Sequence, residues 1–244
     1  MSTLVKVARY HLVQPFQYLA VPWMVMGFAF AVNVIIFATN PASQHTVATA
    51  NGLVSVASTD GRYTGALSSF FIMFLVLGLV GISRSLPFGL ALGVSRRSYY
   101  AGTALLAVAL AAADGLALTG LQAIERATGG WGVHMGFFRV PYLLNGPWYL
   151  TWLTSFVGLA LLFVYGMWFG IVWRRWNLAG TLAFIAAQVT ALLGAALAVT
   201  WAHGWAGVGH FFTGLTAAGL TGLLAALAVA LLAGGQATIR HATV

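Results

Sequence analysis

The amino-acid sequence predicts an all-α integral membrane protein with about six transmembrane helices and both termini in the cytoplasm. Hydrophobic residues make up 61% of the 244 residues and charged residues only 6%, whereas a soluble protein carries about 25% charged residues. The charged side chains stand singly or in pairs between apolar runs, and these runs reach the roughly 20 residues that a helix needs to cross a bilayer. Lipid must therefore cover most of the surface.

Charge-poor intervals, bounded by charged or helix-breaking residues, give the individual elements of a single transmembrane domain, residues 1–244. Apolar residues alternate at helical spacing with basic ones over residues 4–17, which predicts an interfacial helix on the inner leaflet. The last two spans share a charge-free stretch, which we divide at the Gly-, His- and Trp-rich segment 202–210. The predicted spans cover residues 18–39, 65–83, 99–124, 148–173, 177–201 and 211–232.

The distribution of basic residues sets the predicted orientation. Basic residues near span ends are retained in the cytoplasm, and with the amino terminus inside, eight of them fall on the inner side and three on the outer. We expect a multi-pass protein of the bacterial plasma membrane that contacts lipid and not nucleic acid, because the basic residues form no solvated patch. The inner set is Lys6, Arg9, Arg84, Arg96, Arg97, Arg174, Arg175 and Arg240, and the outer set is Arg62, Arg126 and Arg139.

The clearest functional signal lies between the second and third predicted spans. Ser85 can cap a short helix, and Pro87 suits its first turn, where the missing N–H has no helical partner. Gly93 can end that helix, and Ser95 can cap the third span. The apolar side chains of the short helix need a surface to pack against, which can be the membrane interface, neighbouring helices or a cytosolic partner. These side chains are Leu86, Phe88, Leu90 and Leu92.

The run Ala-Leu-Gly-Val-Ser-Arg-Arg-Ser-Tyr-Tyr, residues 91–100, resembles the corresponding loop in small permease subunits of ABC-2-type exporters. Those subunits have an amino-terminal interfacial helix, six spans and a short coupling helix that docks on an ATPase subunit. The resemblance implies that segment 86–97 couples this chain to an ATPase, and that a second permease half, identical or homologous, completes the export unit. The implied coupling residues are Leu86, Pro87, Phe88, Leu90, Leu92, Ser95 and Arg96. The alternative role of Arg96 and Arg97 is that of plain topology signals, and for Arg97 it is the preferred interpretation.

The sequence carries no catalytic motif of its own. It has no Gly-x-x-x-x-Gly-Lys-[Ser/Thr] run, and its one lysine is Lys6, so it holds no standard P-loop. For a permease, ATP and Mg²⁺ would therefore belong to a separate ATPase chain, and this chain would need no cofactor or metal. The absence of cysteine excludes thiolate ligands and cysteine nucleophiles. We expect a non-enzymatic subunit that moves an apolar or amphipathic substrate out of the cell.

Asp114 is the only acid inside a predicted span. A carboxylate at the bilayer centre costs about 2.5–3.5 kcal/mol on insertion scales, so such residues face a cavity or a partner. We expect it in the outer half of the membrane, with Asn33 at similar depth and Gln122 two turns further along the same face. These residues and Gln188 are the candidate substrate pathway, and interhelical hydrogen bonding is their structural alternative.

Two other functions compete with the permease. One is a secondary transporter driven by protons through Asp114, although such folds usually show internal repeats and broken helices, which this sequence lacks. The other is a non-transporting assembly or sensory membrane protein.

Overall fold

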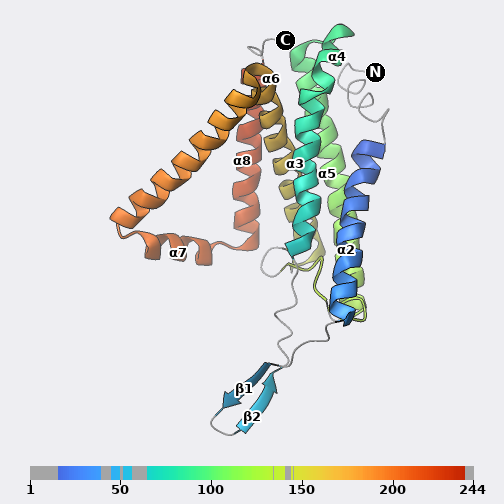
Figure 1. The fold of residues 1–244 in the computed structure, drawn as a ribbon, viewed down its shortest axis with the longest axis vertical. Helices are drawn as coiled ribbons and strands as arrows, with labels where there is room; N and C mark the ends of the chain where they lie inside the picture. The colour runs from blue at the N-terminus through green and yellow to red at the C-terminus, as the bar shows by residue number, and fades with distance from the viewer. Residues whose placement is uncertain are drawn as a thin grey trace.

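The computed structural model describes residues 16–39, 65–133, 135–140, 144 and 146–239, and the backbone of 45–49 and 52–56. The predicted interfacial helix lies outside these residues except for its last two, as do Lys6, Arg9, Arg62 and Arg240. The described part is helical apart from a hairpin, for which the sequence predicted no element (Figure 1). In this hairpin β1, His45–Thr49, pairs antiparallel with β2, Gly52–Val56.

Five helical segments of the described chain are long and apolar enough to cross a membrane, which is compatible with the predicted multi-pass membrane protein. The first joins a π-helical turn to α2, and the second runs from a short 3-10 turn, η3, through α3 into α4. The elements are η1, Phe16–Ala20; α2, Val21–Thr39; η3, Gly65–Leu67; α3, Ser68–Ser83; α4, Ser85–Ala91; α5, Arg96–Ala127; α6, Trp148–Trp201; α7, Trp205–Gly214; and α8, Ala217–Thr238.

Helix α6 combines the predicted fourth and fifth spans. Its 54 residues would measure about 80 Å as a straight helix, against about 30 Å for the bilayer core. The chain reverses direction at Asn177, which has the non-helical angles φ 54° and ψ −149° (Figure 1). Asparagine reaches positive φ more readily than most residues. We call residues 148–176 the proximal arm and residues 178–201 the distal arm.

The predicted boundaries of the last span, residues 211–232, are wrong at both ends. Residues up to Gly214 belong to α7, a separate helix that runs across the ends of its neighbours (Figure 1). Helix α8 begins only after Thr216, whose Oγ1 accepts a hydrogen bond from the Gly219 amide at 3.1 Å. Threonine is a favoured N-cap because it satisfies an amide that has no helical partner. The break between the last two long helices is therefore wider than the predicted segment 202–210.

The closest helix contact joins α3 to the proximal arm, and glycines make it possible. A Cβ added at Gly78 would overlap the carbonyl oxygen of Phe163, and one at Gly166 would overlap that of Leu75. Small residues let helix backbones approach in membranes, where apolar side chains gain little from leaving lipid. The Gly166-x-x-x-Gly170 motif thus packs within the chain.

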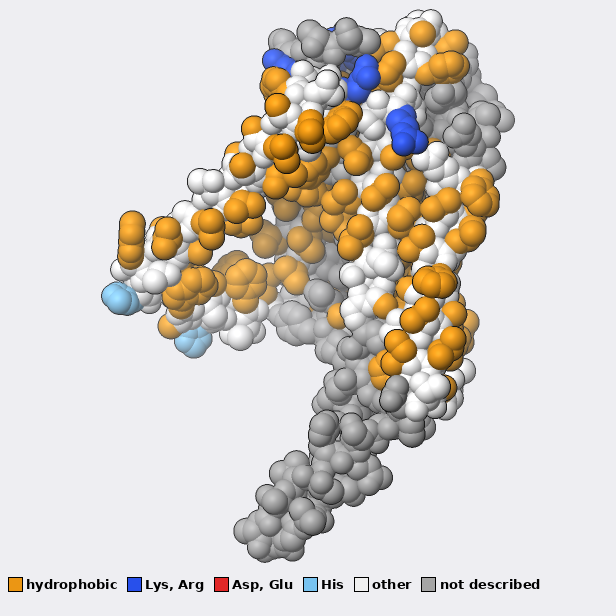
Figure 2. Space-filling model, viewed as in Figure 1, with side chains coloured by type: hydrophobic (Ala, Val, Ile, Leu, Met, Phe, Trp, Pro, Cys, Tyr) orange, Lys and Arg blue, Asp and Glu red, His pale blue; other side chains and the backbone are white. Residues whose placement is uncertain are grey.

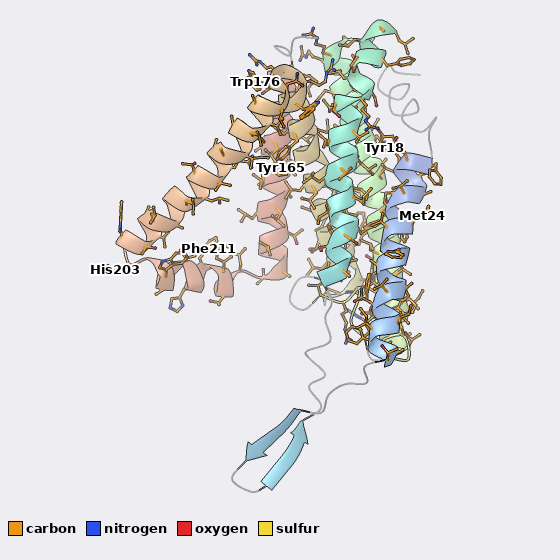
Figure 3. The ribbon with its side chains drawn as sticks, in the orientation of Figure 1. Tyr18, Met24, Tyr165, Trp176, His203 and Phe211 are labelled. Carbon is orange, nitrogen blue, oxygen red and sulfur yellow. The ribbon has the colours of Figure 1, made fainter. Side chains whose placement is uncertain are left out.

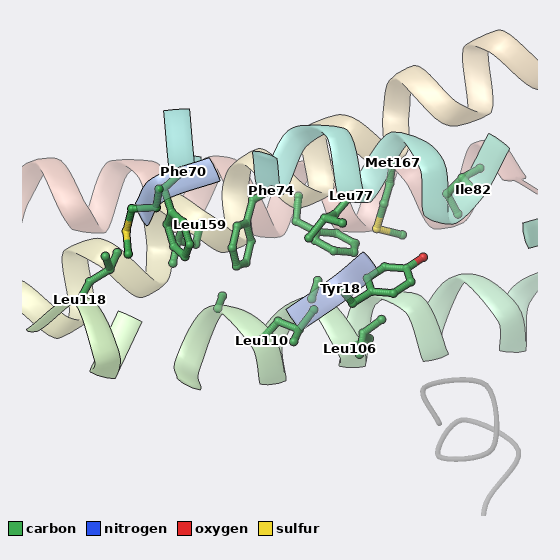
Figure 4. Packing of buried hydrophobic residues seen from close by; sticks show 14 of the residues in the cluster. Tyr18, Phe70, Phe74, Leu77, Ile82, Leu106, Leu110, Leu118, Leu159 and Met167 are labelled. Atoms are coloured by element: carbon green, nitrogen blue, oxygen red, sulfur yellow. The ribbon is translucent and has the colours of Figure 1, made fainter. Parts of the chain in front are cut away.

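Buried aromatic and aliphatic side chains fill the space between α3, α5 and the proximal arm (Figure 4). The rings of Phe70 and Phe74 lie 5.6 Å apart, and Phe74 lies 6.4 Å from Phe163 of the proximal arm. Leu106 and Leu110 of α5 belong to the same cluster. The proximal arm is the centre of the packed bundle, because it contacts α3, α5 and α8.

Helix α8 is fastened to this bundle by hydrogen bonds as well as by packing. The hydroxyls of Thr154 and Thr221 lie 2.8 Å apart. Near the other end of α8, the Trp168 indole donates to the Leu231 carbonyl at 2.9 Å, and the Tyr100 hydroxyl donates to the neighbouring Leu232 carbonyl at 3.3 Å. Polar links of this kind help to hold helices together in lipid.

Candidate functional site

Helix α4 follows α3 almost without interruption. Arg84, between the two helices, keeps right-handed helical angles of φ −97° and ψ −42°. Ser85 is consequently the first residue of α4, and no side chain caps this helix. The prediction that Ser85 caps the helix is wrong, because α3 does not unwind before it.

The end of α4 agrees with the prediction. Gly93 has φ 79°, its amide donates to the Leu90 carbonyl at 2.9 Å, and the Val94 amide donates to the Gly89 carbonyl at 3.1 Å. This pair of bonds is the Schellman arrangement, which requires a left-handed residue after the helix and therefore favours glycine.

The start of α5 is fixed by a cap, and one of its residues contacts both α3 and α4. Ser95 caps α5, since its Oγ accepts a hydrogen bond from the Ser98 amide at 3.2 Å, as predicted. The Tyr99 hydroxyl donates to the Gly81 carbonyl at 2.9 Å, and its ring covers Gly89, where a Cβ would lie 2.6 Å from a ring carbon. Helix α4 is thus fixed to both α3 and α5.

The predicted coupling residues divide between two faces of α4. Leu86 is buried, and Pro87 and Leu90 are half-buried against the bundle. Phe88 and Leu92 are 55% and 64% exposed and turn away from it. Arg96 is half-buried. The other exposed residues beside Phe88 and Leu92 form, together with these two side chains, what we call the exposed row on α4. These other residues are Arg84, Ala91, Gly93, Ser95 and Arg97.

Helix α4 shares its end of the bundle with the reversal of α6 (Figure 1). The arginines visible in Figure 2 gather at this end. Here the guanidinium of Arg175 lies 4.5 Å from the centre of the Trp176 ring, a cation–π contact. The described arginines at this end are Arg84, Arg96, Arg97, Arg174 and Arg175, and those at the opposite end are Arg126 and Arg139.

Asp114 of α5 is buried, with 7% of its surface exposed. Its Oδ1 accepts a hydrogen bond of 2.9 Å from the indole nitrogen of Trp23 on α2. The Trp23 ring also packs edge-on against Phe70, with 5.3 Å between ring centres. A buried polar group needs such a partner, and Asp114 therefore links α2 to α5.

Asn33 does not lie at the depth of Asp114, which corrects the prediction. It is ten residues beyond Trp23, the partner of Asp114, and so about 15 Å further along α2. The prediction took the starts of the two spans to lie at the same depth in the membrane. In the structure α2 starts further from the α4 end than α5 does (Figure 1), so each residue of α2 lies further from that end than predicted. The Nδ2 of Asn33 donates to the Ala29 carbonyl of its own helix at 2.7 Å.

The two glutamines of the predicted pathway form hydrogen bonds with segments that lie away from Asp114. Gln122 is buried and donates through Nε2 to the carbonyl of Leu144 in the loop before α6. Gln188 of the distal arm accepts a hydrogen bond from the Tyr165 hydroxyl of the proximal arm. The four predicted pathway residues therefore do not converge on one site in this structure.

A polar centre at the end opposite α4 escaped the sequence analysis. Glu125 is only 2% exposed. Its carboxylate accepts hydrogen bonds from the Trp131 indole at 3.0 Å and from the amides of Phe137, Phe138 and Arg139 at 2.9, 2.8 and 3.1 Å. Hydrogen bonds to a charged acceptor are strong ones. The available signal was an acid at a span end, with a Gly-rich run that begins at Gly129.

The loop that Glu125 organises also holds the far end of α2. Gly129, Gly130, Trp131 and Gly132 all have positive φ, so the chain coils tightly after α5. Phe30 of α2 packs against this loop, with ring centres 5.0 Å from Trp131 and 5.3 Å from Phe137. The loop is therefore a packed part of the bundle.

Comparison with known proteins assigns no family: no family model, curated protein or solved structure matches this chain. Among the described residues, the exposed row on α4 and the buried Asp114 are the features that bear on function.

Proposed function

We propose that this chain is the membrane-spanning permease subunit of an ATP-driven exporter of the ABC-2 type. Helix α4 carries the proposal. It is held rigidly at one end of the bundle, yet it presents Phe88 and Leu92 outward among arginines. Large apolar side chains at the centre of a polar rim are the usual composition of a protein–protein contact.

In this proposal each arm of α6 crosses the bilayer, which gives six crossings in total. The distal arm would measure about 36 Å and α8 about 33 Å, so each suffices for a core of about 30 Å. Among the described residues, five arginines lie at the α4 end and two at the other. This bias supports a cytoplasmic α4 end in a plasma membrane, with both chain termini on that side.

The contacts of α4 offer a route for coupling. Tyr99 of α5 donates a hydrogen bond to Gly81 of α3, and its ring covers Gly89 of α4. A displacement of α4 would therefore move the adjacent ends of α3 and α5. ATP and Mg²⁺ would be held by a separate ATPase chain, and a second permease half would complete the transporter. The apolar surfaces of the spans suit an apolar or amphipathic substrate.

Co-purification tests the proposal. The tagged chain is expressed with a candidate P-loop ATPase, sought among the neighbouring genes, and we expect a stable complex with ATP hydrolysis in proteoliposomes. The double variant Phe88→Ala and Leu92→Ala should lower ATPase recovery at least tenfold, because both side chains are more than half exposed and can reach a partner. Its thermal stability is measured alongside. Trp201→Ala is the matched control, since Trp201 is 79% exposed at the opposite end.

Two results would refute the permease assignment. One is failure of the unaltered chain to recover any ATPase or to support ATP-dependent transport. The other is full ATPase recovery by the double variant, which would remove α4 from the contact.

Asp114 supports a second candidate, a proton-coupled secondary transporter, because it is a carboxylate buried within a span. Asp114→Asn separates the two functions. The asparagine Oδ1 can still accept the Trp23 hydrogen bond, so we expect the fold to persist. ATP-dependent transport that is unchanged in this variant supports the permease. Transport that is driven by a pH gradient without ATP, and that the variant loses while it assembles normally, supports the proton-coupled transporter.

A further inference from the structure

Helix α7 joins the far ends of two long apolar helices. The distal arm and α8 both run from the α4 end to the opposite end, and α7 lies across their tips (Figure 1). Both helices are long enough to cross the bilayer core. A helix that connects their ends at a steep angle to both therefore lies in the plane of the membrane surface.

The sequence of α7 separates into two faces. Helical spacing places Trp205, Val208, Phe211 and Phe212 together on one side, and His210 and Thr213 on the other, with small residues around them. Trp205, Phe211 and Phe212 are between 54% and 56% exposed, and Val208 is half-buried, so more than half of each aromatic side chain is open to its surroundings.

The aromatic face turns toward the membrane side of α7. Figure 3 shows Phe211 on the side of α7 that faces the distal arm and α8, and His203 at the tip between α7 and that arm. In Figure 2 the two described histidines, His203 and His210, lie on the outward side. The orientation of α7 thus directs its apolar residues toward the bilayer and its imidazoles toward water.

The chemistry of this region identifies what covers the aromatic face. Residues 177–239 contain no Asp, Glu, Lys or Arg, so the region offers nothing to an ion-pairing protein partner. Trp201 is 79% exposed beside α7, and the Trp205 indole donates to Thr200 Oγ1 at 3.0 Å. Amphipathic tryptophans of this kind gather at the boundary between lipid headgroups and acyl chains.

We propose that α7 is an interfacial helix that inserts its aromatic face into the lipid leaflet opposite α4. Binding comes from burial of apolar surface and not from attraction to anionic lipid, because the helix carries no cationic side chain of the Lys or Arg type. The helix thereby fixes the tip of the distal arm, which has few contacts within the chain. This inference goes beyond the permease assignment and holds or fails independently of any ATPase.

The absence of cysteine from the sequence makes a clean test possible. Single cysteines replace Val208 and Phe211 on the aromatic face, with His210→Cys and Thr213→Cys as matched controls on the other. Each variant carries a nitroxide spin label in phosphatidylcholine vesicles, with and without phosphatidylglycerol. Collision rates with oxygen report lipid, and collision rates with a water-soluble nickel chelate report water.

We expect labels at 208 and 211 to collide with oxygen several-fold more than with nickel, and labels at 210 and 213 to show the reverse, in both lipid mixtures. Low collision with both reagents at 208 and 211 would mean that protein, such as a second copy of the chain, covers this face, and would overturn the proposal. High nickel collision at all four positions would place α7 in water and overturn it as well. Two positions per face guard against one variant that fails to fold.

Discussion

The two arms of α6 are both apolar, yet their surroundings are opposite. The proximal arm buries a continuous face against α3, α5 and α8, and Phe163 and Met167 are fully buried. The distal arm buries none of its residues, and Leu192 is 72% exposed. One apolar helix thus has a packed half and a splayed half.

The difference shows that apolar character does not decide which helix packs. Lipid tails are as apolar as leucine, so a leucine gains little by exchanging lipid for protein. The proximal arm offers close backbone contact at Gly166 and an indole donor at Trp152, which bonds to the Ala112 carbonyl at 3.1 Å. The distal arm has Gly194 in open space, and Gln188 is its main polar link to the rest of the chain.

The largest expected effect comes from filling the glycine contact. In Gly166→Val the new side chain overlaps the Leu75 carbonyl, and we expect the free energy of unfolding to fall by about 3 kcal/mol, at the upper end for an overpacked core. Gly194→Val in the distal arm is the control, because nothing lies within 4 Å of its Cβ position. It should change stability by less than about 0.5 kcal/mol. Unfolding in mixed detergent micelles measures both, and equal losses would remove the distinction between the arms.

The second prediction extends the comparison to the loop that closes the packed half. Glu125→Gln removes the charge from a carboxylate that accepts four hydrogen bonds, and its amide group brings donors where acceptors are needed. We expect a loss of about 2 kcal/mol of unfolding free energy. Arg126→Gln, on the exposed neighbour, should cost less than about 1 kcal/mol. The same unfolding assay compares them, and a neutral Glu125→Gln variant would contradict the role assigned to this carboxylate.

Features that depend on neighbouring residues in the chain could be predicted from the sequence. Gly93 and Ser95 were predicted correctly because a left-handed turn and a helix cap depend on neighbouring residues alone. The division of the long apolar stretch near Asn177 was predicted for a similar reason, since Arg174 and Arg175 precede it. The six crossings, the topology and the coupling role of α4 stay predictions.

The contacts of Asp114 and Glu125 could not be read from the sequence. Trp23 lies 91 positions from Asp114, and their meeting depends on how far α2 is shifted along α5. Nothing local encodes that shift, which is why Asn33 was placed at the wrong depth. Helix α7 was not predicted because its last residues, 211–214, resemble the start of a span in composition, and only their direction distinguishes them.

A smaller effect is expected at the reversal between the arms. Asn177 holds φ 54° and ψ −149°, a region that glycine adopts without cost and other residues adopt at about 1–3 kcal/mol. Asn177→Gly should therefore raise the unfolding free energy by about 1 kcal/mol, and Asn177→Ala should lower it. A loss of stability in the glycine variant would show that the asparagine side chain, and not the backbone, maintains the reversal.

The smallest effect concerns the hydrogen bond between the two arms, from the Tyr165 hydroxyl to Gln188. Interhelical hydrogen bonds in a membrane protein average about 0.6 kcal/mol in double-mutant cycles, so Tyr165→Phe and Gln188→Leu should show a coupling of this size. The nearby contact of Phe169 with Phe184, 5.2 Å between ring centres, remains in all variants and holds the arms near the reversal. If the coupling instead exceeded about 2 kcal/mol, this single bond would control the position of the distal arm. The splayed half would then depend on the protein and not on the lipid around α7.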